Sequence, residues 1–189
     1  MIRGGSTMFN HPFQIITQDQ TSIHFLSYSN ALLDAVRSAK KRVWVLAYVI
    51  NANLSKQSDP VTLLMTVLQA RRKAGCDIRF ILDSPKENRG NYHCNKFFMR
   101  HLMEWGFQFC TPPDNVTSHA KAVLVDDRIL FIGSHNLAKS SLTNPLDCTV
   151  ELRNGFLIQS FAETYKMLWG SSSMVSYTPE DMPAAKYYG

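Results

Sequence analysis

HAKAVLVDDRILFIGSHN, residues 119–136, is the stretch that decides the fold and the chemistry of this chain. Side chains alternate along an extended segment, so His119 and Lys121 are predicted to project from one face of a strand. The apolar run at 123–125 continues that strand and suits a sheet that is covered on both sides. One face of the predicted strand therefore carries an imidazole and an ammonium group.

A hairpin is predicted immediately after this strand. Asp126 and Asp127 indicate a turn, and the apolar, partly β-branched run at 128–132 indicates a second strand. A hairpin returns the chain to its starting point, which places Gly133 beside His119. Glycine at that position permits a close approach of the backbone.

The polar residues of this segment suit the recognition of a phosphate group. Ser134 and Asn136 can donate hydrogen bonds to nonbridging phosphate oxygens. Lys121 supplies a point charge against the same anion, and His119 is a candidate nucleophile. A lone histidine or lysine is usually a core or surface residue, so it is the joint spacing of these groups that favours a site for phosphodiester chemistry.

The spacing H-x-K-x4-D followed by G-S-x-N resembles the signature of the phospholipase D superfamily. All six signature positions are filled, by His119, Lys121, Asp126, Gly133, Ser134 and Asn136. The pattern before the motif is similar to that of the small single-motif bacterial endonucleases of this superfamily, and the resemblance covers roughly residues 27–170. It implies an α/β fold in which a mixed β-sheet is flanked by helices on both faces, with one HKD domain per chain.

The chemistry of this superfamily is covalent and uses no metal or other cofactor, so the resemblance implies a phosphodiesterase of that kind. One histidine attacks phosphorus to give a phosphohistidine, a second histidine protonates the leaving oxygen, and water or an alcohol resolves the intermediate. This chain contains a single H-x-K pattern. The resemblance therefore implies a homodimer with its active site at the two-fold axis, where two copies of His119 face each other and two copies of Lys121 stabilise the transition state.

A carboxylate that orients the histidine is a further part of the family's site. Asp147 lies eleven residues past Asn136, at a position where the family usually has a glutamate. Glu151, a few residues on, is the alternative. The resemblance thus implies a catalytic set of His119, Lys121, Ser134, Asn136 and Asp147, supported by Asp126, Gly133 and Glu151.

The substrate class stays open at this point. The formal net charge of +5 favours an anionic partner, and the first expectation is nucleic acid, DNA or RNA, held by basic residues beside the cleft. The candidates are Lys86, Arg89, Lys96 and Arg100. A lipid phosphodiesterase acting on phosphatidyl lipids or cardiolipin is an alternative, and it needs an apolar rim, for which the local candidates are Phe97, Phe98 and Met99. A noncatalytic nucleic-acid-binding module is the third hypothesis.

Length and composition fit one domain. A chain of 189 residues, 45% hydrophobic and 19% charged, can bury one sizeable core. We expect a loose N-terminal segment at 1–20, the catalytic domain at 21–170, and a C-terminal tail at 171–189 that is flexible or wraps the surface. The longest apolar run, 43–50, is too short to cross a bilayer, so no stable membrane insertion is expected. No signal-like leader is visible, and four cysteines without a C-x-x-C pair favour a reducing compartment, which predicts a cytoplasmic location.

Outside the motif, hydrophobic periodicity predicts alternating helices and strands. Asp59 and Pro60 predict the N-cap and first position of a helix that stops at Gly75. The other predicted helices are 30–40, 95–105, 137–142 and 159–169, and the other predicted strands are 22–26, 42–50, 76–82, 107–110 and 147–153.

Overall fold

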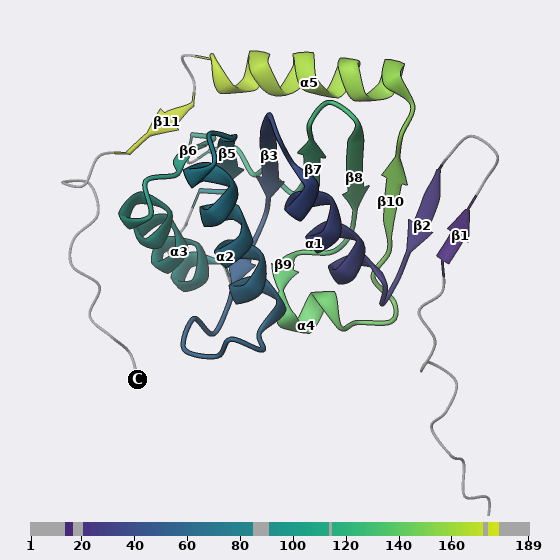
Figure 1. The fold of residues 1–189 in the computed structure, drawn as a ribbon. Helices are drawn as coiled ribbons and strands as arrows, with labels where there is room; N and C mark the ends of the chain where they lie inside the picture. Colours follow the sequence, from purple (N-terminus) through teal and green to yellow (C-terminus); the bar gives the residue numbers. More distant parts are fainter. Residues whose placement is uncertain (1–13, 17–20, 85–90, 114, 172–173, 178–189) are drawn as a thin grey trace, which may run out of the picture.

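The computed structural model describes residues 14–16, 21–84, 91–113, 115–171 and 174–177, which form a mixed nine-stranded sheet with helices on both faces (Figure 1). The expected α/β architecture is confirmed. The strands are β1 (Gln14–Ile16), β2 (Ser22–His24), β3 (Arg42–Ala47), β5 (Asp77–Leu82), β6 (Gln108–Thr111), β7 (Ala122–Val125), β8 (Ile129–Gly133), β10 (Thr149–Leu152) and β11 (Val175–Ser176). Their order is β1-β2-β10-β8-β7-β3-β5-β6-β11. Neighbours among β3, β5 and β6 are parallel, and the other neighbours are antiparallel.

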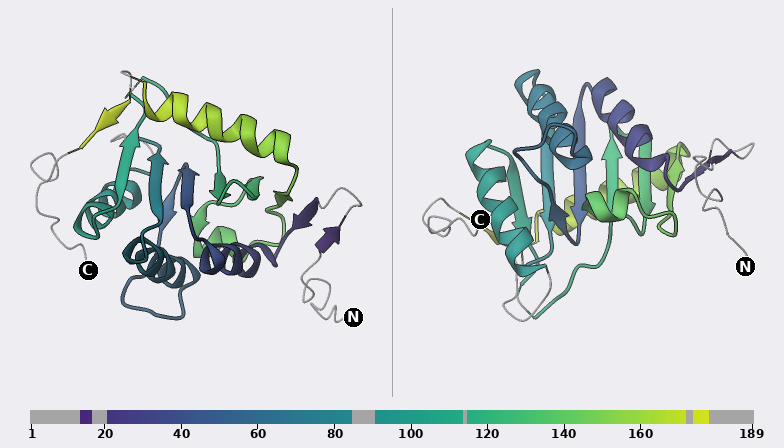
Figure 2. Two further views of the ribbon diagram at one scale, coloured as in Figure 1. Left: turned by 45° about the horizontal axis from the view of Figure 1, so that its top comes forward. Right: turned by 90° about the horizontal axis from the view of Figure 1, so that it is seen from below.

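The helices are distributed unequally between the two faces of the sheet. The larger core lies between the sheet and the helices on one face, and the smaller core lies under a long helix on the other face (Figure 2). The helices over the larger core are α1 (Tyr28–Ser38), α2 (Pro60–Lys73) and α3 (Tyr92–Glu104), and the long helix on the other face is α5 (Gly155–Trp169). A short helix, α4 (Lys139–Leu142), follows the motif.

Each face of the sheet has its own hydrophobic core. Val36, Leu68 and Phe98 bring α1, α2 and α3 into the larger core. On the other face, Tyr165 of α5 stacks on Trp44 of β3, with ring centroids 4.9 Å apart. Central strands that are covered on both sides need apolar residues on both sides, which explains the continuous apolar run of β7.

The predicted boundaries of α2 are confirmed. The side chain of Asp59 accepts hydrogen bonds from the backbone N–H groups of Val61 and Thr62 at 2.9 and 3.2 Å. Pro60 is the first helical residue. Gly75 adopts a left-handed φ of 92°, a conformation that ends helices and suits glycine.

The strand expected at 42–50 is divided in two. Its end forms β4 (Ile50–Asn51), which pairs in parallel with β9 (Leu137–Ala138) in a separate two-stranded sheet. The side-chain amide of Asn95 causes this departure, because it donates to the carbonyl oxygen of Tyr48 and accepts from the backbone N–H of β4. The break places the end of β3 beside the motif.

The C-terminal part of the chain also differs from the expected boundaries. Helix α5 starts at Gly155 rather than 159, because the Asn154 side chain caps its first turn. Beyond it, β11 pairs with β6, and the ring of Tyr177 stacks on Phe109 with centroids 5.7 Å apart. Residues 174–177, part of the tail expected to be flexible or to wrap the surface, therefore lie against the domain.

Candidate active site

The β7–β8 hairpin brings the two halves of the motif together. Asp126 and Asp127 have φ values of 54° and 53°, the left-handed conformation found at the centre of type I′ turns. At the other end of the hairpin, the backbone N–H of Gly133 donates to the carbonyl oxygen of Lys121 at 3.2 Å. A side-chain carbon at Gly133 would collide with the backbone of Cys148. This close approach is what requires a glycine there.

His119 and Lys121 lie in the segment before β7 rather than on the strand itself. Their side chains nevertheless lie together, because Lys121 Nζ is 3.1 Å from His119 Nδ1 and donates to the carbonyl oxygen of His119 at 2.7 Å. His119 is exposed. Burial lowers the pKa of Lys121, and the nearby charge of Asp147 opposes that shift. The site thus presents an accessible imidazole beside an amine.

An aromatic ring that the sequence analysis did not identify packs against this pair. The ring centroid of Tyr48 lies 4.5 Å from that of His119 and 5.0 Å from Lys121 Nζ. An aromatic face attracts a cation through its quadrupole. Because Tyr48 falls inside the strand expected at 42–50, it reads as a core residue, and only the break after β3 turns it towards the motif.

A buried carboxylate holds the segment that precedes His119. Asp83 directly follows β5, is fully buried, and accepts a hydrogen bond from the backbone N–H of Ser118 at 2.6 Å. Its second oxygen accepts a hydrogen bond from the side-chain amide of Asn91 at 2.7 Å. Both oxygens are therefore satisfied inside the protein. Ser118, the residue before the candidate nucleophile, is thus held by Asp83 at the end of β5. Local sequence patterns do not connect these two positions.

Asn95 of α3 links the backbone of Asp83 to that of Tyr48. Its Nδ2 donates to the carbonyl oxygens of Tyr48 and Asp83 at 2.8 and 3.0 Å, and the side chain is fully buried. Buried amides whose hydrogen bonds are satisfied rigidify their surroundings. The buried Asn95 side chain thus ties the chain at Asp83, which holds Ser118, to the chain at Tyr48, whose ring packs on His119.

Asp147 contacts Ser134 in this chain. Ser134 Oγ donates to Asp147 Oδ1 at 2.9 Å, and Ser141 Oγ donates to Oδ2 at 2.6 Å. Burial tends to raise the pKa of Asp147, but the hydroxyl donors, Ser141 first, hold it below its ordinary value. The backbone N–H of Cys148 fixes Ser134 Oγ from another side at 2.9 Å. That Asp147 orients His119 therefore stays a prediction.

Asn136 is held close to the same group of side chains. Its backbone N–H donates to Ser141 Oγ at 2.9 Å. Its side-chain oxygen is buried and has no hydrogen-bond partner among the residues that the structure describes. An unpaired buried acceptor costs free energy, and the part of this amide that can donate to a phosphate oxygen is its Nδ2 group.

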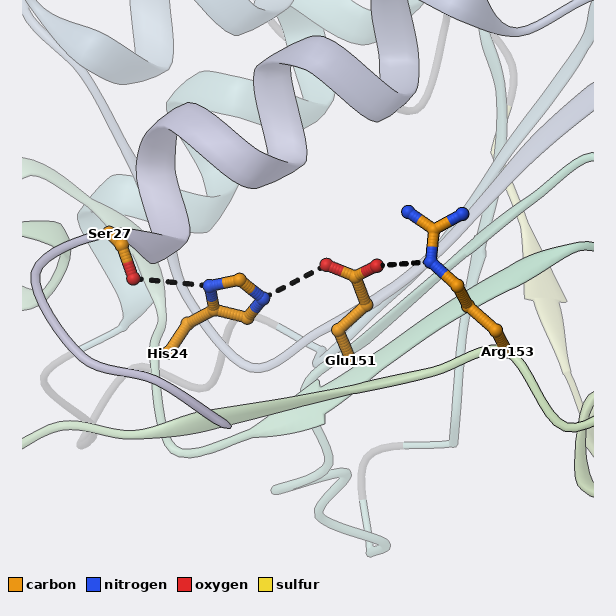
Figure 3. Close-up of polar contacts among 4 residues, drawn as sticks. All are labelled: His24, Ser27, Glu151 and Arg153. Atoms are coloured by element: carbon orange, nitrogen blue, oxygen red, sulfur yellow. Dashed lines mark hydrogen bonds and ion pairs between the residues drawn. The ribbon is translucent and has the colours of Figure 1, made fainter. Parts of the chain in front are cut away.

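Glu151 takes part in a different set of contacts from the one expected. Figure 3 shows its carboxylate between His24 and Arg153. One carboxylate oxygen lies 2.9 Å from His24 Nε2 and the other lies 2.7 Å from Arg153 Nε. The other ring nitrogen of His24 lies 3.1 Å from Ser27 Oγ. The hydrogen bond from His24 holds the pKa of Glu151 below its ordinary value. Both oxygens of Glu151 thus have partners other than His119, and that Glu151 is an alternative orienter of His119 stays a prediction.

Asp126 has a structural place in the motif. Its carboxylate accepts hydrogen bonds from three consecutive backbone N–H groups, those of Lys40, Lys41 and Arg42, at 2.7, 2.7 and 3.0 Å. Burial alone would raise the pKa of Asp126, but these donors hold it below its ordinary value. The residue therefore ties the hairpin turn to the connection between α1 and β3.

The four basic residues expected to contact the substrate differ in their positions and contacts. Lys86 and Arg89 lie outside the described residues. Lys96 is exposed on α3, with its Nζ 3.1 Å from the Tyr92 hydroxyl, and remains free to meet an anion. Arg100 donates to Glu104 at 2.9 Å. Part of its charge is therefore already compensated.

The described ranges contain no group of three or more His, Cys, Asp or Glu side chains arranged to hold a metal ion. No helix within them is both long enough and apolar enough to cross a bilayer.

Comparison with known sequences identifies a family. Residues 32–169 match the family described as "Cardiolipin synthase, PLD-like domain". Cardiolipin synthase 1 of Bacillus cereus is 31% identical over 112 residues, which make up 59% of this chain and 20% of that protein. The chain thus spans about a fifth of the length of this curated relative.

Comparison with solved structures shows the same fold. Nuc of Salmonella typhimurium, a phospholipase D family member, has a TM-score of 0.65 and 23% identity over 83% of this chain and 98% of that one. NucT of Helicobacter pylori has a TM-score of 0.63 and 17% identity, with the same 83% and 98% coverage. Phosphatidylserine synthase of Haemophilus influenzae has a TM-score of 0.67 and 14% identity, over 95% of this chain and 43% of that one. At these identities the likeness concerns the fold.

Proposed function

Since the chain belongs to the family of phospholipase D-like domains, we propose that it is a metal-independent nuclease that cleaves phosphodiester bonds of DNA or RNA. The observation that carries the proposal is the pair formed by the exposed His119 and the half-buried Lys121, whose side-chain nitrogens lie 3.1 Å apart. An accessible nucleophile beside a cation is what attack on an anionic phosphodiester requires. The catalytic domain in this proposal spans 21–170.

The reaction proceeds in two displacements. An imidazole nitrogen of His119 attacks phosphorus, and the bond from phosphorus to the leaving sugar oxygen breaks as that oxygen takes a proton from a second imidazole. Water then attacks phosphorus and gives a proton to the second imidazole, and the phosphorus–nitrogen bond breaks. The chain has one H-x-K pattern, so the second imidazole is His119 of the partner subunit, placed across a two-fold axis.

The surrounding groups act on the phosphate oxygens. Lys121 supplies positive charge where negative charge develops in the transition state. The side-chain Nδ2 of Asn136 donates to a nonbridging oxygen. Ser134, whose hydroxyl proton goes to Asp147 at 2.9 Å, donates to the phosphate only when it exchanges that bond for one to the substrate. Among the four basic candidates, Lys96 is the described one with no carboxylate partner, and it contacts a phosphate further along the polyanion. Salt weakens such a contact.

Nucleic acid is favoured over lipid by the burial of α3. Phe98 and Met99, two of the three residues that a lipid site would need for an apolar rim, are fully buried in the core. The third, Phe97, is partly buried against that core. The net charge of +5 and the small single-motif layout agree with a polyanionic substrate.

A lipid phosphodiester is the second candidate, and different observations favour it. The matching family is described by cardiolipin synthase, and the curated relative carries the same name. Val116 and Leu146 expose 46% and 82% of their surfaces. Val116 lies two residues before Ser118, and Leu146 directly precedes Asp147, so both exposed apolar residues are close in sequence to site residues.

Hydrolysis of four labelled nucleic acids tests the proposal: single- and double-stranded DNA and RNA, each in excess EDTA. Vesicles containing cardiolipin or phosphatidylglycerol are assayed in parallel. The wild type is compared with His119→Ala and with His93→Ala, which removes another exposed histidine. We expect cleavage of at least one nucleic acid by the wild type and by His93→Ala, and none by His119→Ala.

Each other outcome selects a different function. Turnover of lipid alone supports the second candidate. Binding of nucleic acid without cleavage, unchanged in His119→Ala, supports a noncatalytic module. Equal cleavage by wild type and His119→Ala contradicts the assigned nucleophile.

A further inference from the structure

The ring of Tyr48 contacts the two reactive side chains of the candidate site and takes no part in core packing. Its centroid lies 4.5 Å from that of the His119 imidazole, with the ring planes at 50°, and 5.0 Å from Lys121 Nζ. Its neighbours Ala47 and Ile50 are buried in the larger core, whereas the half-buried Tyr48 belongs to neither of the two cores that the described residues form. Core packing therefore does not explain an aromatic residue at this position.

The backbone that carries this ring is fixed on both sides of the residue. The carbonyl oxygen of Tyr48 accepts from Asn95 Nδ2 at 2.8 Å, and the backbone N–H of Ile50 donates to Asn95 Oδ1 at 3.1 Å. The carbonyl oxygens of Ala47 and Val49 also accept backbone hydrogen bonds, at 3.0 and 3.2 Å. Buried polar groups with satisfied hydrogen bonds rigidify their surroundings. The Tyr48 ring is thus a firmly placed surface at the end of β3.

The imidazole of His119 is held by fewer contacts. It is exposed and belongs to the irregular segment before β7. Among the described residues, its partners are Lys121 Nζ, at 3.1 Å, and the Tyr48 ring. The histidines that pair with a carboxylate in the described chain are His24 and His101. An exposed side chain with few contacts occupies several rotamers, whereas attack on phosphorus requires one.

We propose that Tyr48 is a positioning residue, whose ring holds the His119 imidazole and the Lys121 ammonium side by side at the phosphodiester. This role rests on the proposed function, and it adds a residue outside the motif that governs how two side chains of the motif lie. The tilted contact between the two rings limits rotation of the imidazole. The face of the phenol ring attracts the ammonium through its quadrupole. One fixed ring therefore orients the nucleophile and keeps the cation beside it.

The ring also opposes the effect of burial on the charge of Lys121. Burial lowers the pKa of Lys121, and the charge of Asp147 raises it. An aromatic face favours the protonated amine, so the Tyr48 ring acts in the same direction as Asp147. If an apolar group without a ring replaces Tyr48, the burial remains and the attraction is lost. The amine should then lose its proton at lower pH.

Tyr48→Leu tests the proposal, with Tyr48→Phe as the matched control. Leucine keeps an apolar side chain without a ring, whereas phenylalanine keeps the ring, which makes the contacts with His119 and Lys121. Because Tyr48 belongs to neither core, leucine removes no core contact. We expect kcat to fall about 10–100-fold in Tyr48→Leu with a smaller change in KM, and its alkaline limb to move to lower pH. Tyr48→Phe should keep wild-type kinetics.

Nuclear magnetic resonance of labelled lysine gives a readout that needs no activity. The signal of the Lys121 methylene next to Nζ is assigned by its loss in Lys121→Arg. Because Nζ lies 5.0 Å from the Tyr48 centroid, the ring current should displace this signal. We expect the displacement in wild type and in Tyr48→Phe. In Tyr48→Leu it should be lost, and the amine should titrate at lower pH. Circular dichroism should show the same helix content in all three proteins.

The other outcomes separate this role from the proposed function. A Tyr48→Leu variant with raised KM and unchanged kcat overturns the role, because the ring would then bind substrate. Equal losses of kcat in Tyr48→Leu and Tyr48→Phe also overturn it, because the hydroxyl would then be the important group. If the wild type cleaves none of the tested phosphodiesters, the proposed function fails and the Lys121 signal decides: an identical signal and titration in all three proteins overturn the role, and the expected differences support it.

Discussion

Asp83 accepts a hydrogen bond from the backbone N–H of Ser118 at 2.6 Å, although the two residues are 35 positions apart. The bond fixes the segment that leads to His119, so its loss should displace the imidazole without removing it. We expect Asp83→Asn to lower kcat about 10–100-fold with a smaller change in KM, because displacements of about 1 Å at a reacting group are costly. Steady-state kinetics on the cleaved substrate measure both constants.

A compensating substitution separates positioning from misfolding. In Asp83→Asn the new amide group meets the amide of Asn91, which normally donates to Asp83 at 2.7 Å. Adding Asn91→Asp restores one donor and one acceptor, so the double variant should recover most of kcat. A double variant that is as stable as the wild type yet stays as slow as Asp83→Asn argues against the positioning role.

This contact marks the limit of what the sequence predicts. The turn at Asp126 and Asp127 and the cap at Asp59 need only neighbours within a few residues, so short patterns identify them. The contact of His24 with Glu151 joins positions 127 apart. Such pairs depend on which strands become neighbours, and hydrophobic periodicity does not specify that order.

The same limit applies to the candidate site. The spacing of the motif identifies His119, Lys121 and Ser134, because the hairpin that unites them is local. Sequence spacing does not identify Tyr48 and Asn95 as site residues, because an aromatic residue at a strand end and an amide in a helix are ordinary in any sequence. They gain their place only when β3 breaks and α3 packs against that break.

Asp126 should matter for folding and leave the chemistry intact. Its carboxylate accepts from three backbone N–H groups, at Lys40, Lys41 and Arg42. We expect Asp126→Asn to lower the free energy of unfolding by about 1–3 kcal/mol, the usual contribution of hydrogen bonds to a charged group. The value of kcat per folded molecule should not change. Urea denaturation and active-site titration measure the two quantities.

Asp127→Asn is the matched control for this prediction. Asp127 has the same left-handed backbone, with φ of 53°, and its carboxylate makes an ion pair with Arg42 at 3.5 Å near the surface. Exposed pairs contribute less than about 1 kcal/mol. Equal losses of stability in the two variants would show that the buried hydrogen bonds of Asp126 are not what stabilises the hairpin.

The contact between His24 and Glu151 should make the free energy of unfolding depend on pH in the acid range. The hydrogen bond from His24 holds the pKa of Glu151 below its ordinary value of 4.5. A carboxyl group with a lowered pKa in the folded chain stabilises the fold above that ordinary value, and the contribution is lost as pH falls through the folded pKa. We expect the wild type to lose stability below pH 4.5. The Glu151→Gln variant should be less stable at neutral pH and less sensitive to acid.

Denaturation curves at a series of pH values measure this difference. The control is Asp34→Asn, which removes an exposed carboxylate that pairs with Arg37 at 3.2 Å. The free energy of unfolding of Asp34→Asn should change with pH in the same way as that of the wild type. Parallel curves for wild type and Glu151→Gln would instead mean that Glu151 does not contribute through its charge.

Lys121 should set the alkaline limit of activity. Burial lowers the pKa of Lys121 below its ordinary value of 10.5, with the charge of Asp147 acting in the opposite direction. Only the protonated amine stabilises the transition state, so activity should fall as pH rises through the lowered pKa. We expect the alkaline limb of the kcat profile to lie below pH 10.5 in the wild type.

Exchange of the lysine for arginine tests this cause directly. A guanidinium stays charged throughout the accessible range, so Lys121→Arg should move the alkaline limb to higher pH. It should also lower kcat at neutral pH about 10–100-fold, because a planar fork does not reproduce the position of an ammonium that lies 3.1 Å from His119 Nδ1. Lys139→Arg, an exposed exchange on α4, should change neither the limb nor kcat. If the alkaline limb of the kcat profile does not move in Lys121→Arg, another group titrates there. Lys121 then acts in binding alone.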